Sequence, residues 1–62
     1  MCLAKAVQLR DGEQTPLCAY VSTFRTEGDR VVLTDVLGEE TSIVGRILSV
    51  DLVKNLIVIQ AA

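Results

Sequence analysis

Turn-forming residues divide this chain into short apolar segments, and their spacing limits the fold more than any other feature. The segments are rich in Val, Ile, Leu and Thr, and no stretch shows a sustained helical period. Strands at intervals of roughly 8 to 12 residues, joined by short turns, are typical of all-β folds. We therefore expect five strands, over residues 2–9, 17–25, 30–37, 42–52 and 56–60.

The residues between these segments favour the same arrangement. Asp11-Gly12 is a strong signal for a tight hairpin, and Lys54-Asn55 is expected to close the last one. Gly45, inside the fourth segment, marks a bulge or a sharp bend. Five strands in so short a chain predict a small antiparallel barrel of the SH3-like or Sm-like type, which removes exposed sheet edges.

Alternating side chains within the strands indicate which residues share a face. We expect Ile57 and Ile59 to be buried in the fifth strand, and the third and fourth strands each to have one apolar face, formed by Val31, Leu33 and Leu37 and by Leu48, Val50 and Leu52. On the first strand, Cys2, Ala4 and Ala6 form a face of small side chains. This face either lies at a dimer contact or fills a tight barrel interior.

The length of the chain bears on its oligomeric state. Its 62 residues form one domain, residues 1–62. A domain this short buries only about 60% of the surface that its unfolded chain exposes, and it is marginally stable alone. Oligomerisation is one common remedy, and we expect a homodimer.

Composition disfavours several classes of function. The net charge is −2 and the only aromatic residues are Tyr20 and Phe24, whereas a nucleic-acid surface needs a positive patch and stacking aromatics. The chain has no histidine, so the usual acid–base group and imidazole metal ligands are missing. We therefore expect neither nucleic-acid binding nor enzymatic activity.

Charged residues bear on the location of the protein. Lys5, Arg10, Asp11 and Glu13 interrupt the first twenty residues, and no segment reaches the roughly 18 apolar residues of a membrane span. Two cysteines allow one disulfide, but the composition favours a reducing compartment in which thiols stay free. We expect a cytoplasmic protein without membrane association.

Cys2 has the most distinctive chemistry in the chain. Its thiolate lies within chelating reach of the amino-terminal amine and of backbone nitrogens, those of Met1, Cys2 or Leu3, depending on whether Met1 is removed. Planar sets of N and S ligands suit Ni(II) or Cu(II), and a twofold dimer would supply the second half of such a plane. The alternative is that Cys2 is a small buried hydrophobic residue.

The other candidates have simpler interpretations. Cys18 lies in mid-strand and is expected to be a core thiol, with a second metal ligand as the alternative. Asp35, Glu39 and Glu40 flank a turn and are expected to be solvated rather than to hold a cation. Asp51 is expected to accept hydrogen bonds from the backbone of the turn that follows it.

Three blocks of sequence resemble the CooT family, and together they span essentially the whole chain. They are the start Met1-Cys2-Leu3-Ala4-Lys5, the block Val32-Leu33-Thr34-Asp35 with Gly38-Glu39-Glu40, and Gly45-Arg46-Ile47 leading to Val50-Asp51-Leu52. The resemblance implies a homodimer of SH3-like or Sm-like barrels. It also implies one Ni(II) ion per dimer, bound by the Cys2 thiolates and N-terminal nitrogens.

The same resemblance implies a nickel metallochaperone for the maturation of carbon monoxide dehydrogenase, with that enzyme or its maturation factors as the client. Two rival hypotheses remain. One is an Sm-like module that binds RNA or peptide, and the other is a structural dimer in which Cys2 is passive. The sequence leaves the natural metal open among Ni, Cu, Zn and Co.

Overall fold

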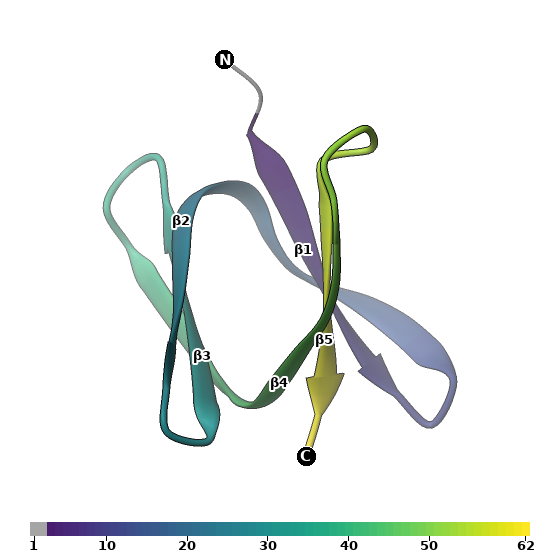
Figure 1. Ribbon diagram of the computed structural model, residues 1–62. Coiled ribbons are helices and arrows are strands. Elements are labelled where there is room, and N and C mark those ends of the chain that lie inside the picture. Colours follow the sequence, from purple (N-terminus) through teal and green to yellow (C-terminus); the bar gives the residue numbers. More distant parts are fainter. Residues whose placement is uncertain (1–2) are drawn as a thin grey trace.

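Five β-strands close into one ring in the computed structural model, which describes residues 3–62 (Figure 1). The strands are β1 (Ala4–Arg10), β2 (Glu13–Glu27), β3 (Arg30–Asp35), β4 (Glu40–Asp51) and β5 (Leu56–Ala61). Consecutive strands pair antiparallel, while β5 closes the ring against β1 in parallel. An odd number of strands in up-and-down order requires this parallel pair, because the first and the last strand run in the same direction. The predicted small all-β barrel of five strands is confirmed.

The longest strands are β2 and β4, with 15 and 12 residues, because each pairs with one neighbour along its first part and with a different neighbour along its second part. The first half of β2 pairs with β1 and, from Val21 onward, the second half pairs with β3. Likewise, β4 pairs with β3 up to Val44 and with β5 from Gly45 onward. The two bent strands allow a short chain to enclose a core. Within the described residues, no helix is long and apolar enough to cross a membrane.

Gly45 is the residue at which β4 changes partner, so the sharp bend expected there is confirmed. A Cβ atom at this position would collide with the backbone carbonyl oxygen of Gln60 in β5. Glycine therefore allows the two strands to approach each other closely. The register shift of β4 lies further along the strand, between Ile47 and Ser49.

The turn between β1 and β2 has the geometry that its sequence predicts. Asp11 and Gly12 both have positive φ angles, 51° and 80°, and the flanking Arg10 and Glu13 pair with each other. A two-residue turn with this geometry follows the twist of the strands, and Asp and Gly tolerate it.

The core is formed by six buried side chains from β1, β2, β3 and β5, namely Ala6, Val21, Val31, Leu33, Ile57 and Ile59. The burial expected for Ile57 and Ile59 is confirmed. Ala6 is fully buried, which supports the barrel-interior interpretation of the small residues on the first strand. Ala4 is half-buried and packs against the core, and Cys2 lies outside the described residues.

Two expectations about apolar faces need correction. Leu37 does not continue the buried face of Val31 and Leu33: it is 83% exposed, because β3 ends at Asp35 and Leu37 lies in the following turn. Leu48, Val50 and Leu52 are also exposed, and they do not form a regular strand face. The register shift after Ile47 breaks the alternation of β4, and Leu52 lies beyond the end of the strand.

Candidate functional site

The first strand begins beside the β4–β5 turn, at one end of the ring (Figure 1). The backbone N–H of Lys5 donates a hydrogen bond to the carbonyl oxygen of Asn55 in that turn, with an N···O distance of 2.8 Å. On its other side, Ala4 pairs with Val21 of β2, which in turn pairs with Asp35 at the end of β3. The start of β1 is thus fixed between β2 and the β4–β5 turn.

The predicted metal ligands are only partly within the described residues. Leu3, whose backbone nitrogen is one candidate, is half-buried, while Met1 and Cys2 lie outside the described residues. The role of Cys2 as a metal ligand therefore stays a prediction.

Asp51 organises the β4–β5 turn. Its Oδ1 accepts hydrogen bonds from the backbone N–H groups of Val53 at 3.0 Å and Lys54 at 2.9 Å. The role predicted for this carboxylate is confirmed. The bonds leave the apolar side chains of the turn pointing into solvent, with Leu52 81% and Val53 94% exposed.

The β3–β4 turn has the same construction, which the sequence interpretation missed. Oδ1 of Asp35 accepts hydrogen bonds from the backbone N–H groups of Leu37 at 2.9 Å and Glu39 at 3.0 Å. The signal was present in the sequence, because an Asp followed by two aliphatic residues occurs both here and at Asp51. In each turn an Asp carboxylate accepts hydrogen bonds from the backbone, and the two aliphatic side chains that follow the Asp are exposed.

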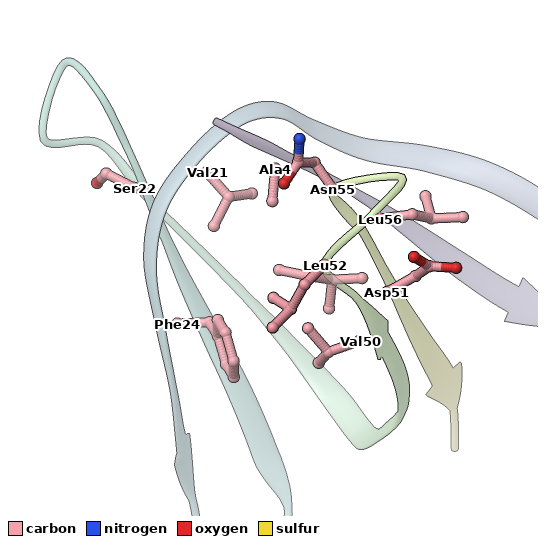
Figure 2. Close-up of a pocket in the computed structure, with 10 residues that line it drawn as sticks. Ala4, Val21, Ser22, Phe24, Val50, Asp51, Leu52, Asn55 and Leu56 are labelled. Atoms are coloured by element: carbon pink, nitrogen blue, oxygen red, sulfur yellow. The ribbon is translucent and has the colours of Figure 1, made fainter. Parts of the chain in front are cut away.

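A hollow of about 160 Å³ opens between β2, β4 and the start of β1 (Figure 2). Figure 2 shows Phe24 of β2 and Val50 of β4 on either side of the opening, with Leu52 near its mouth. The wall is mostly apolar, and its polar groups are Ser22, Asp51 and Asn55, in a lining that comprises Ala4, Val21, Ser22, Phe24, Val50, Asp51, Leu52, Asn55, Leu56 and Ile57.

The described residues offer no second metal site. Among residues 3–62, no group of three or more His, Cys, Asp or Glu side chains is arranged to hold a metal ion. Cys18 has a free thiol, is half-buried and packs against the core, as a core thiol should. Asp35, which was expected to be solvated rather than to hold a cation, accepts hydrogen bonds from two backbone N–H groups through Oδ1.

The acidic residues nearby take part in a surface ion-pair network. Arg25 donates hydrogen bonds to Glu27 at 2.7 Å and to Glu40 at 3.4 Å, and all three side chains are about half exposed. The hydrogen bond and charge of Glu27 raise the pKa of Arg25 above its ordinary value. Exposed pairs contribute little to stability, so this network is a feature of the surface.

Comparisons with known proteins support both the family resemblance seen in the sequence and the observed barrel fold. The family model for CooT, described as a CO dehydrogenase accessory protein, matches residues 1–60. Among solved structures, the crystal structure of a candidate CooT from Carboxydothermus hydrogenoformans superimposes with a TM-score of 0.88 at 18% sequence identity, covering 98% of each chain. No curated protein sequence matches the chain.

Proposed function

Because the chain belongs to the CooT family of CO dehydrogenase accessory proteins, we propose that it carries Ni(II) to carbon monoxide dehydrogenase during maturation of that enzyme. The observation that carries this proposal is the family match over residues 1–60, which includes Cys2. The client is the dehydrogenase itself or one of its maturation factors.

Cys2 is the proposed ligand residue. Two copies of the chain form a homodimer and hold one Ni(II) ion between them, each supplying a Cys2 thiolate and a nitrogen from Met1, Cys2 or Leu3. Thiolate and backbone nitrogen together suit a square-planar metal such as Ni(II). A thiolate must stay reduced to bind metal, which fits a protein of the reducing cytoplasm. The start of β1 lies at one end of the ring (Figure 1), which supports a site at this end of the chain.

Delivery of the ion requires accessible ligands rather than catalysis. Terminal ligands can be exchanged one at a time for those of a client, so the ion need never be free in solution. The chain has no histidine for acid–base chemistry. We therefore assign it a carrier role, in which nickel is the cargo and the protein is not an enzyme.

Activation of nickel-free carbon monoxide dehydrogenase tests this proposal. The dehydrogenase is incubated with nickel-equilibrated, desalted carrier in the presence of a chelator that removes free nickel, and CO oxidation is measured. The parent chain and Cys18→Ser should activate the enzyme, whereas Cys2→Ser should give no more activity than nickel with chelator alone. Equal activation by Cys2→Ser and the parent would rule out Cys2 as the ligand that carries the ion.

A further inference from the structure

Asn55 is the last residue of the β4–β5 turn, and its backbone has a conformation that few residues adopt. Its φ angle is 54°, and among residues 3–62 Asp11 is the one other non-glycine residue with a positive φ. Asparagine tolerates this left-handed conformation better than most residues do, whereas a β-branched residue there is a marked outlier. The residue type at position 55 is therefore matched to a specific backbone geometry.

This geometry directs the carbonyl oxygen of Asn55 to the first strand. The oxygen accepts a hydrogen bond from the backbone N–H of Lys5 at 2.8 Å, next to the pair that Lys5 and Leu56 form in the parallel ladder. Because β5 begins only at Leu56, the acceptor at this end of the ladder belongs to the turn and not to a strand. The conformation of the turn therefore decides whether β1 has a partner at its start.

The other side of β1 is paired less regularly at this end. Ala4 pairs with Val21 of β2, but the register of the β1–β2 ladder shifts between Ala4 and Ala6 and again between Ala6 and Val7. The parallel ladder between β1 and β5 starts at Lys5 and continues without a shift. The regular pairing of β1 therefore begins at the hydrogen bond that Asn55 accepts.

The β4–β5 turn is built to hold Asn55 in place. Oδ1 of Asp51 accepts hydrogen bonds from the N–H groups of Val53 and Lys54, and Asp51 also pairs with Leu56 where the two strands end. The turn is thus closed by a strand pair and stabilised from within by a carboxylate. A turn fixed in this way can set the position of the strand that bonds to it.

The β3–β4 turn allows an internal comparison. It has the same kind of carboxylate anchor, at Asp35, and a positive φ of 85° at Gly38. Its backbone hydrogen bonds join it to itself and, through the N–H of Val36, to the carbonyl of Tyr20 in β2. A left-handed residue in that turn therefore affects β2 and β3 rather than the first strand.

We propose that Asn55 is a positioning residue for the nickel site: its left-handed backbone fixes the start of β1, the strand that follows Cys2 and Leu3 in the sequence. The role in nickel binding rests on the function proposed above. A segment attached to a fixed strand has fewer conformations to lose on binding an ion than a segment attached to a frayed strand. Groups that orient a metal ligand without touching the metal commonly contribute about 10- to 100-fold in affinity.

Amide hydrogen exchange of the full chain in EDTA, followed residue by residue by NMR, tests the backbone part without nickel. Asn55→Val should raise the exchange rate of the Lys5 amide about tenfold, the effect of losing one backbone hydrogen bond. Gly38→Val is the matched control, because it places the same side chain at a positive φ in the other turn, where a Cβ has open space. It should leave the Lys5 amide within about twofold of the parent. Asn55→Gly tolerates the positive φ and should behave like the parent.

Nickel affinity, measured by competition with a chelator, tests the functional part. Asn55→Val should raise the dissociation constant for Ni(II) about tenfold or more, whereas Asn55→Gly and Gly38→Val should change it less than about threefold. Thermal unfolding should show similar destabilisation in the two valine variants, so a difference in nickel affinity between them does not come from stability. Should Asn55→Val not fold, an ester in place of the amide between Ala4 and Lys5 removes the same N–H donor, and the 62-residue chain is short enough for chemical synthesis.

The remaining outcomes separate this inference from the proposed function. Unchanged exchange of the Lys5 amide in Asn55→Val overturns the positioning role, and so does equal nickel affinity in Asn55→Val and Gly38→Val. A loss of affinity in Asn55→Gly as large as in Asn55→Val also overturns it, because the side chain of Asn55 would then be responsible. Full nickel binding by Cys2→Ser is a different failure: it removes the proposed nickel site and the role of Asn55 in it, whatever the exchange rates are.

Discussion

The backbone N–H of Lys5 and the carbonyl oxygen of Asn55 lie 2.8 Å apart and join the start of the chain to its last turn. This hydrogen bond extends the parallel pairing of β1 and β5, in which Lys5 lies opposite Leu56. The start of β1 is consequently held by backbone hydrogen bonds to the last turn and the last strand. The start of β1 is therefore fixed beside the Asp51-anchored turn.

The Asp51 anchor is expected to contribute measurably to stability. Asp51→Ala removes the acceptor for two backbone N–H groups and should lower the free energy of unfolding by about 1 to 2 kcal/mol. Asp51→Asn keeps an acceptor oxygen and should lose less. Urea denaturation of the two variants beside the parent measures both effects. Identical stability of all three proteins would show that the turn does not depend on this carboxylate.

Substitution of Gly45 should be more harmful than substitution of a glycine in open space. A methyl group at Gly45 meets the carbonyl of Gln60, so β4 and β5 must separate, and Gly45→Ala should cost about 3 kcal/mol. Gly38→Ala is the comparison, because a Cβ there has no neighbour within 4 Å. Its positive φ of 85° still strains an alanine, by about 1 kcal/mol. A larger loss at Gly38 than at Gly45, measured by thermal or urea unfolding, would contradict the close approach of the two strands.

Two leucines of similar sequence context should respond very differently to truncation. Leu33 is fully buried, and Leu33→Ala should destabilise the protein by about 3 kcal/mol. Leu37→Ala removes an exposed side chain and should change stability by less than about 0.5 kcal/mol. Chemical denaturation distinguishes the two variants. A comparable loss of unfolding free energy in both would show that Leu37 is part of the core, contrary to the structure.

The contrast between Leu33 and Leu37 shows how far the sequence predicts this fold. Strand number, the Asp11-Gly12 turn and the burial of Ile57 and Ile59 follow from local patterns of turn residues and alternation. Leu37 was misassigned because a strand end depends on where the partner strand stops pairing, which is a tertiary property. The outward position of Val50 likewise depends on a register shift that local alternation does not reveal.

The candidate site was predictable in part. An Asp beside a tight turn commonly accepts hydrogen bonds from the backbone of that turn, so the bonds of Asp51 were predicted from the local sequence. The hollow between β2 and β4 was not, because it arises from the bends that bring Phe24 and Val50 to either side of one opening. The Cys2 site follows from the chemistry of a thiolate near a chain terminus and from family resemblance, and it stays a prediction.

Nickel should stabilise the protein through Cys2. A ligand that binds only the folded state adds about 2.7 kcal/mol at a free concentration 100 times its dissociation constant, so the melting temperature should rise with added Ni(II). Cys2→Ser should lose this rise, whereas Cys18→Ser should keep it because Cys18 packs against the core. Differential scanning calorimetry of the three proteins measures the shift. A rise in Cys2→Ser as large as in the parent would place the ion elsewhere.

Native mass spectrometry of the tag-free chain with Ni(II), beside Cys2→Ser, tests the shared nickel site most directly. The mass of the complex gives the number of chains and of metal ions, and it shows whether Met1 is present. We predict a dimer that holds one Ni(II) ion and a Cys2→Ser dimer that holds none. Nickel retained by Cys2→Ser, or one ion bound to each separate chain, would contradict a site formed by two Cys2 thiolates.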